Sequence, residues 1–298
     1  MRKFQIISSF LIKVIAILCM TLDHIGLFLR YLNPYSNLYM TLCTIFRSFG
    51  RLALPLFIFM IIEGVLHTKS IKKYLLRLGI MAGIISIAIA IITYVNFGLS
   101  TSMIEGSGNI FLDLLLIAVS VYLLNQDNKW KKLFILLPIA LSIISFSVKC
   151  YETANNVSIY WFPTFLYLHG DWFSLLLGIG FYYSYKFADG YISYKSEEGI
   201  DKSVWEINGN YRLLVGAFQL AVLFIASILL YVFKYLIPTG IYWDAEIQLC
   251  AIISGAFILL YNGKRGYNAR WFQYGAYLYY PLHLLVLIVI YIIISGGL

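Results

Sequence analysis

Long apolar stretches recur along the whole chain, and they constrain the fold more than any other feature. Hydrophobic residues make up 61% of the chain and charged residues only 12%, with a mean hydropathy of +0.82. Proteins that fold in water carry about 25% charged residues, because their surface must be polar. A helix that crosses a bilayer instead needs about 20 mostly apolar residues. The composition therefore predicts an integral membrane protein with the lipid bilayer as its surroundings.

The apolar stretches predict an all-α, polytopic transmembrane helical bundle of about nine spans, forming a single domain over residues 1–298. Pro163 interrupts the apolar segment Ile159–His169, which is expected to be a re-entrant or interfacial element. The most polar segment, Asp189–Tyr211, is predicted to be a loop. The nine spans are expected at about 5–29, 39–66, 74–97, 110–125, 131–149, 171–188, 213–235, 246–262 and 273–296.

Basic residues lie mainly in loops that fall on one side of these spans, and such residues favour the cytoplasm. The pattern predicts a cytoplasmic N-terminus and a location in the cell membrane as a multi-pass protein. The net charge of +8 is scattered between apolar runs, so nucleic acid is not an expected partner. The four cysteines are far apart in sequence and show neither a disulfide framework nor metal-ligand spacing. No metal site is expected.

The first span contains ionisable residues, which are costly inside a membrane and mark function or pairing. Lys13 and His24 are eleven residues apart, so they share one face of a helix with a rise of about 16 Å between them. Asp23 lies about 100° around the helix from His24 and is expected to face a neighbouring helix. A lysine that reaches the cytoplasmic surface and a packed interfacial histidine would also explain the pattern.

The second span carries Arg47 and Arg51, which are four residues apart and share a helix face. Two guanidinium groups in a membrane helix require counter-ions, for which Asp23, Glu63 and a phosphate-bearing ligand are candidates. A purely structural ion-pair cluster is the alternative.

Two further residues of the second span affect its backbone. Gly50 permits close approach of another backbone or of a ligand. Pro55 removes a backbone donor and is expected to kink the helix.

Other polar residues fall at or between the spans. His67 and Lys72 belong to a basic, anion-attracting patch, although topology and anionic lipid would also account for it. His283 lies near the middle of the last span. Asp113 and Asp171 open the fourth and sixth spans, both on the outer side of the predicted topology, and a simple position at the membrane interface would also explain either one.

Four sequence runs resemble the TraX family, whose namesake acetylates the N-terminus of F-pilin and which looks related to the wider membrane acyltransferase superfamily. The runs are LDHIG, GRLALPLFIFMIIEG, KYLLRL and YPLHL. The first 80 residues resemble the family well and the last 30 moderately. The wider group has an Arg/Lys-x10-His motif in an early helix, and Lys13 and His24 fit that spacing.

The resemblance implies transfer of an acetyl group from cytoplasmic acetyl-CoA to an acceptor at or beyond the membrane. His24 is then the catalytic base or the acyl carrier, with Asp23 beside it. The acceptor is expected to be a peptide N-terminus or a surface glycan.

The remaining candidates are assigned to the two substrates. Residues expected to bind the donor are Lys13, Arg47, Arg51, His67 and Lys72. Residues expected to bind the acceptor are Glu63, His283 and Asp171. Lys13, Arg47 and Arg51 would line a polar tunnel through which the thin arm of the donor reaches His24.

Two other functional classes fit part of the sequence. Buried Arg, Glu, Asp and His residues also build the pathways of secondary transporters or exporters. No paired Gly- or Pro-broken helices in corresponding halves support that class. A non-enzymatic membrane scaffold would tolerate the loss of His24, Arg47 and Arg51 together.

Overall fold

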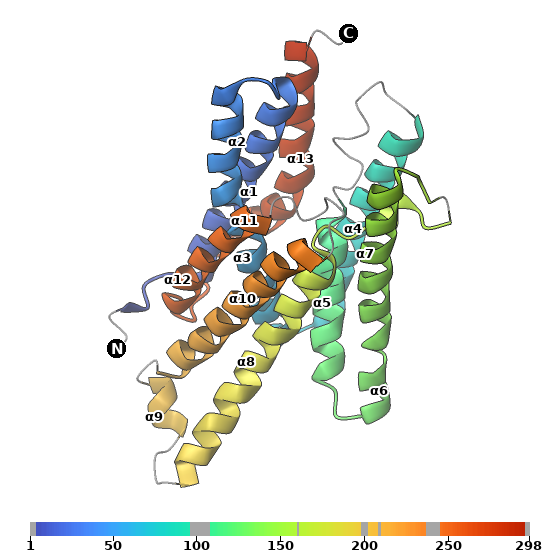
Figure 1. Ribbon diagram of the computed structural model, residues 1–298. Helices are drawn as coiled ribbons and strands as arrows, with labels where there is room; N and C mark the ends of the chain where they lie inside the picture. Colours follow the sequence, from blue (N-terminus) through green and yellow to red (C-terminus); the bar gives the residue numbers. More distant parts are fainter. Residues whose placement is uncertain are drawn as a thin grey trace. The chain divides into compact units, whose positions relative to one another are not determined.

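The computed structural model describes residues 4–95, 108–159, 161–197, 202–207, 210–236 and 245–295. These residues are mainly helical, and their β-structure is limited to one bridge between Ile7 and Tyr261. In chain order (Figure 1) the elements are α1 Ser9–Leu32, α2 Asn37–Gly50, α3 Ala53–His67, α4 Ile71–Val95, α5 Ile110–Leu124, α6 Lys129–Leu133, α7 Leu136–Asn155, the 3₁₀ turn η3 Thr164–Leu166, α8 Asp171–Glu197, α9 Lys202–Ile207, α10 Asn210–Leu236, α11 Ala245–Gln248, the 3₁₀ turn η4 Leu249–Ile253, α12 Ser254–Leu259 and α13 Arg270–Ser295.

Among the described residues, six helical segments are long and apolar enough to cross a membrane. They are Ser9–Leu32, Asn37–His67, Ile71–Ile91, Lys129–Asn155, Asn210–Leu236 and Arg270–Ile294. The apolar helical segments Ile110–Leu124 and Glu246–Leu259 are shorter. The all-α, membrane-embedded class is thus confirmed, whereas about nine spans and the cytoplasmic N-terminus stay predictions.

Two sequence-based expectations about connecting segments need revision. The prediction of a loop over Asp189–Tyr211 is wrong, because α8 continues to Glu197 and Lys202–Ile207 form α9. In the interrupted segment Ile159–His169, the regular structure of the described residues is the short turn η3, and Phe162 and Tyr167 pack against Val148 of α7. Its re-entrant or interfacial position in the bilayer stays a prediction.

The contacts divide the chain into two compact units. Unit 1 consists of Met1–Met60, Tyr183–Ser227 and Glu246–Leu298. Unit 2 consists of Ile61–Tyr182 and Ile228–Ala245. Each unit is described by itself below.

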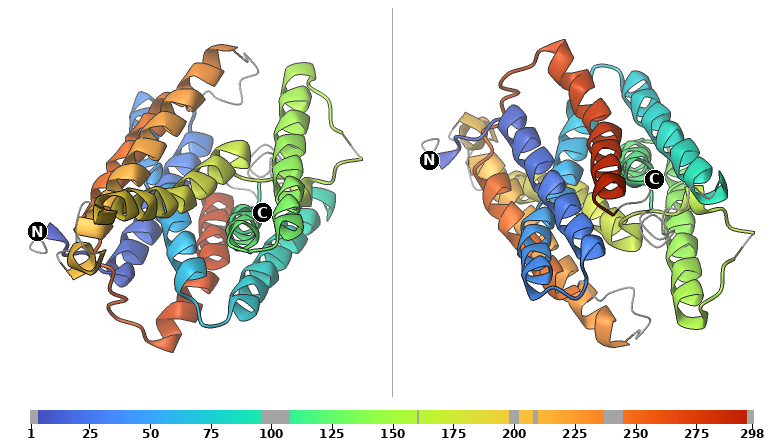
Figure 2. Two further views of the ribbon diagram at one scale, coloured as in Figure 1. Left: turned by 90° about the horizontal axis from the view of Figure 1, so that it is seen from below. Right: turned by 90° about the horizontal axis from the view of Figure 1, so that it is seen from above.

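In unit 1, α1 packs against both α2 and α13, as the ribbon shows from the side and from either end (Figures 1 and 2). The chain before α1 is anchored by backbone hydrogen bonds from Ile7 N to Leu260 O and from Asn262 N to Ile7 O. The side-chain oxygen of Ser8 then accepts from Leu11 N and caps α1. These contacts fix where α1 begins relative to the connection between α12 and α13.

Two glycines allow α1 and α2 to lie close together. A Cβ atom at Gly26 of α1 would lie 3.0 Å from Cβ of Phe46 and 3.1 Å from the carbonyl oxygen of Cys43. A Cβ atom at Gly50 of α2 would overlap the side chain of Asp23. A close approach at Gly50 is therefore present, but the group that approaches is the side chain of Asp23 instead of the expected backbone or ligand.

The second predicted span breaks into α2 and α3 instead of bending as one helix. Arg51 N donates to Arg47 O and closes α2, and α3 starts at Ala53. Pro55 has no N–H to donate to the carbonyl of Arg51, four residues earlier, so the helical ladder is interrupted there. The regular helix is thus interrupted at residues 51–52, whereas the expected kink at Pro55 stays a prediction.

In unit 2, one buried asparagine joins α4, α5 and the segment after η3. The side-chain oxygen of Asn109 accepts from Phe111 N and Leu112 N and caps α5. Its amide nitrogen donates to Ala82 O of α4 at 2.8 Å, and its backbone N–H donates to Tyr167 O at 2.7 Å. Because Asn109 is completely buried, every one of these bonds replaces one that water would otherwise make.

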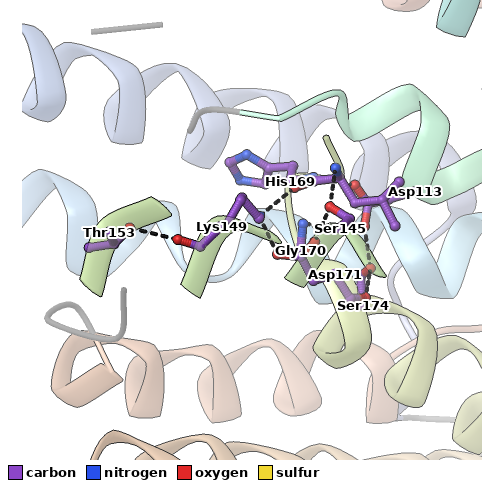
Figure 3. Close-up of polar contacts among 9 residues, drawn as sticks. Asp113, Ser145, Lys149, Thr153, His169, Gly170, Asp171 and Ser174 are labelled. Atoms are coloured by element: carbon purple, nitrogen blue, oxygen red, sulfur yellow. Dashed lines mark hydrogen bonds and ion pairs between the residues drawn. The ribbon is translucent and has the colours of Figure 1, made fainter. Parts of the chain in front are cut away.

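Asp113, one turn into α5, holds the segment that leads into α8 (Figure 3). Its carboxylate accepts from His169 N at 2.6 Å, from Gly170 N at 3.2 Å and from the hydroxyl of Ser174 at 2.5 Å. The carboxylate is buried and satisfied by these donors. Asp113 is thus enclosed within unit 2, and its depth in the membrane stays a prediction.

Beside it, Lys149 of α7 forms an ion pair with Asp171 at the start of α8 (Figure 3). Lys149 also donates to Leu168 O at 2.8 Å, and the hydroxyl of Ser145 donates to Asp171 at 2.7 Å. Asp171 is buried within unit 2, whereas its depth in the membrane stays a prediction. Its φ of 46° is unusual for a residue with a side chain, and the surrounding bonds hold it there.

Replacing Gly50 tests the contact between α1 and α2. We expect Gly50→Ala to destabilise the protein by about 1–3 kcal/mol, because the new Cβ atom displaces Asp23. Gly83→Ala in α4 is the matched control, since a Cβ atom there meets nothing within 4 Å. Thermal unfolding of the purified protein in detergent measures both, and equal midpoints for the two variants would contradict the close approach.

Removing Lys149 tests the ion pair of unit 2. Lys149→Met is expected to lower the stability by about 3–5 kcal/mol, because Asp171 is left buried without its cation. The double variant Lys149→Met/Asp171→Asn should recover part of this loss. Lys132→Met changes an exposed lysine of α6 and should have little effect. A Lys149→Met protein with an unchanged unfolding midpoint would disprove a stabilising pair.

Candidate functional site

In unit 1, the ion pair between Asp23 and Arg51 joins α1 to the end of α2. The Nη2 atom of Arg51 donates to Oδ1 of Asp23 at 2.6 Å, and Nε of Arg47 lies 4.0 Å from the same oxygen. The three side chains are only 10–17% exposed. The expectations that Arg47 and Arg51 share a face and that Asp23 is their counter-ion are confirmed. Formal charges leave this cluster with one excess positive charge.

His24 points from α1 to α13, where it contacts His283. The Nδ1 atom of His24 lies 2.8 Å from Nε2 of His283, and Nδ1 of His283 lies 2.8 Å from the carbonyl oxygen of Tyr279. His283 is 8% exposed and His24 is half-buried. Two histidines that are 259 positions apart in sequence therefore form one hydrogen-bonded chain.

This chain assigns the protons of the neutral imidazoles. A carbonyl oxygen can only accept, so Nδ1 of His283 must donate to Tyr279. Nε2 of neutral His283 then has a lone pair and accepts from Nδ1–H of His24. Because Nδ1 of neutral His24 carries the proton, the in-plane lone pair of this imidazole lies on Nε2. That atom has the chemistry of a general base or a nucleophile.

Aromatic and hydroxyl groups hold the two imidazoles in place. The ring of Tyr279 stacks on His283 with centroids 5.0 Å apart, and Tyr280 meets both imidazoles edge-on. The hydroxyl of Thr21 donates to Ile17 O, so it accepts from the hydroxyl of Tyr279 at 2.8 Å. This bond links α1 to α13 about one turn before His24 along α1.

Lys13 is half-buried on the same helix as His24, in the first half of α1. The shared helical face follows from the spacing, whereas the expected tunnel between the two residues stays a prediction. For metals, the described residues contain no group of three or more His, Cys, Asp or Glu side chains that could hold an ion.

The other predicted site residues lie in unit 2 with partners of their own. Glu63 is buried and its carboxylate is 3.7 Å from Nδ1 of His67, one turn later in α3. His67 and Lys72 are exposed around the connection between α3 and α4. Asp171 pairs with Lys149, as described above. Donor binding by His67 and Lys72, and acceptor binding by Glu63 and Asp171, stay predictions.

Sequence reasoning missed several residues that organise these clusters. Thr21 and Tyr279 were not singled out, because a threonine and a tyrosine in apolar helices are unremarkable in composition. Lys149 was not a candidate either, although a lysine inside the run LSIISFSVKCYE is a signal of burial. Pairing of His24 with His283 needed the three-dimensional arrangement of α1 and α13.

Comparison of the sequence with known proteins identifies its family. The family model described as "TraX protein" matches residues 8–190, more than half of the chain. The protein named "Probable fimbrial assembly protein FimC, serogroup H1" from Dichelobacter nodosus is 45% identical over 71 residues. That match covers 24% of this chain and 27% of the relative, so the chain spans well under two thirds of that relative's length.

No solved structure matches the chain. The family model covers α1, α2 and α3, and thus includes Asp23, His24, Arg47 and Arg51. The sequence runs that resembled this family at the start of the chain fall within the matched residues. The chain belongs to the TraX family.

Proposed function

We propose that this protein is a membrane-embedded acetyltransferase in which His24 activates the acceptor. The observation that carries the proposal is the hydrogen-bonded chain from His24 through His283 to the carbonyl of Tyr279. The chain leaves the lone pair of neutral His24 on Nε2. An acyl transfer needs such a base, because an amine or hydroxyl becomes a good nucleophile only as its proton is removed.

In the proposed reaction, Nε2 of His24 takes a proton from the acceptor while the acceptor attacks the thioester carbonyl carbon. The carbon–sulfur bond then breaks, and the thiolate leaves with the proton that His24 returns. The products are the acetylated acceptor and a free thiol, so atoms and charge balance. Direct attack by Nε2, which forms an acetyl-imidazole first, satisfies the same geometry.

The ion cluster next to His24 suits the charge that develops in this reaction. Asp23, Arg47 and Arg51 together carry one excess positive charge in a largely buried place. Buried cations stabilise an oxyanion more strongly than they would in water. Arg47 and Arg51 are accordingly proposed to stabilise the tetrahedral intermediate or polar groups of the donor.

Acetyl-CoA is the proposed donor, and family membership supports this choice because a namesake of the family acetylates F-pilin. The word "fimbrial" in the name of the relative favours the amino terminus of a pilus subunit as the acceptor, with a surface glycan as the alternative. We further propose a multi-pass arrangement in the cell membrane with the N-terminus in the cytoplasm. Lys13 would then lie nearer the donor side than His24.

His24→Ala tests the role of the imidazole. The rate of acetyl transfer from radiolabelled acetyl-CoA to a pilin peptide or to glycan is expected to fall about 10²- to 10⁴-fold. His169→Ala removes an exposed imidazole of unit 2 and should leave the rate unchanged. Membrane insertion and the unfolding midpoint should match the wild type in both variants. A folded His24→Ala protein with near-normal transfer would refute the assignment.

His283→Phe tests whether His283 positions His24. Phenylalanine keeps a ring against Tyr279 but cannot accept from Nδ1–H of His24, so kcat should fall about 10²-fold with little change in either KM. His283→Gln supplies an acceptor oxygen and should restore part of the rate. If KM for the acceptor rises while kcat is unchanged, His283 binds the acceptor instead.

A further inference from the structure

Gln219 in the middle of α10 is a buried polar residue whose side chain is unsatisfied. It is completely buried, and neither Oε1 nor Nε2 has a hydrogen-bond partner among the described residues. The surrounding sequence, LLVGAFQLAVLFIASILL, is otherwise almost entirely apolar. An unpaired amide in such a place destabilises a protein, and a leucine or methionine would not. The hydrogen-bonding groups of Gln219 would be satisfied by a partner outside the described residues.

The position of Gln219 on α10 is set by close packing against α12. A Cβ atom at Gly216 would lie 3.2 Å from Cδ2 of Leu259, and one at Gly255 would overlap Leu220. These glycines let the two helices run side by side within unit 1 (Figure 1). Gln219 lies at the centre of the buried face of α10, next to this contact.

Two more unsatisfied groups belong to the same pair of helical segments. The hydroxyl of Ser227, two turns after Gln219 on the buried face of α10, has no partner within the described chain. The amide nitrogen of Gln248, at the end of α11, is in the same condition. The turn η4 that follows Gln248 is a 3₁₀ segment in an otherwise α-helical run, a feature that often marks a hinge.

The helices around this seam also border the cluster at His24. Phe257 of α12 packs against a cluster formed by Cys19, Met20, Leu52 and Ala53, which lies about one turn before His24 along α1. The turn η4 contacts α2, which carries Arg47 and Arg51. The seam and the catalytic cluster therefore belong to one unit and share α12 and η4 as a wall.

We propose that the seam between α10 and α11–α12, centred on Gln219, is a binding site for a secondary amide of a substrate. An amide group pairs with another amide through two hydrogen bonds, because Nε2 donates to the ligand carbonyl and Oε1 accepts from the ligand N–H. Ser227 and Gln248 add donors at a second point. Because Gln219 is fully enclosed, α10 and α12 must part for the ligand to enter.

The identity of the ligand rests on the proposed acyl transfer, which offers two sources of secondary amides. One is the pantetheine arm of the donor, and the other is a peptide acceptor. The chemistry recognised at Gln219 is the same for both. Binding measurements with separate probes distinguish them, and they do not depend on turnover.

The experiment compares Gln219→Met with Leu223→Met in protein reconstituted in nanodiscs. Methionine keeps the size of glutamine but cannot form the hydrogen bonds, and Leu223 is a buried apolar residue of the same helix face. Calorimetric titration uses three probes, namely coenzyme A, pantetheine and an acetylated tetra-alanine amide. The unfolding temperature without ligand is measured in parallel.

Gln219→Met is expected to raise the unfolding temperature, because an unpaired amide is removed, and to weaken binding of at least one probe by about tenfold or more. Leu223→Met should change no affinity more than about twofold. Weaker binding of coenzyme A and pantetheine identifies the donor as the ligand. Weaker binding of the peptide alone identifies the acceptor.

Unchanged affinities in Gln219→Met, or a wild-type protein that binds none of the probes, would overturn the amide site. The acetyl-transfer assay separates this failure from that of the enzyme. If the wild-type protein transfers acetyl groups and Gln219→Met is equally active, only the amide site is refuted. Gln219-dependent binding without any transfer refutes only the acetyltransferase.

Discussion

The pairing of Asp23 with two arginines is the interaction on which unit 1 depends. Charges inside an apolar bundle must find partners, because neither lipid nor packed side chains can solvate them. Asp23 reaches Arg51 at 2.6 Å because Gly50 leaves room for the carboxylate at the end of α2. This contact fixes the rotation of α1 about its axis. His24, about 100° further around the helix, is thereby directed to α13 instead of α2.

Both units pair their buried charges, but the proportion of cations to anions in the two clusters is reversed. Unit 1 combines two arginines with one aspartate, whereas the network of unit 2 combines Lys149 with two aspartates. In unit 2 the second carboxylate, that of Asp113, is satisfied by two backbone N–H groups and a serine. That network is closed on itself and holds the segment before α8. In unit 1 the guanidinium groups of Arg47 and Arg51 instead lie near an imidazole with a basic nitrogen, which is an arrangement suited to an anionic intermediate.

Hydropathy and helix spacing were sufficient to predict the membrane class, the common face of Arg47 and Arg51, and the direction of Asp23 toward a neighbouring helix. These features depend on residues close together in sequence. The contact between His24 and His283 could not be predicted, because no periodicity links helices that are separated by most of the chain. The ion pair of Asp171 with Lys149 could not be predicted for a related reason, because the two residues belong to separate helices, α8 and α7.

Buried polar groups in this protein fall into two kinds, and the difference bears on function. Asn109 and Asp113 are satisfied by neighbours on several elements, so packing and stability explain them fully. Gln219 is equally buried, yet among the described residues nothing bonds to its amide. Stability alone would favour an apolar side chain there. The proposed amide site accounts for this cost, because an amide that binds a ligand when α10 and α12 part is satisfied in that state.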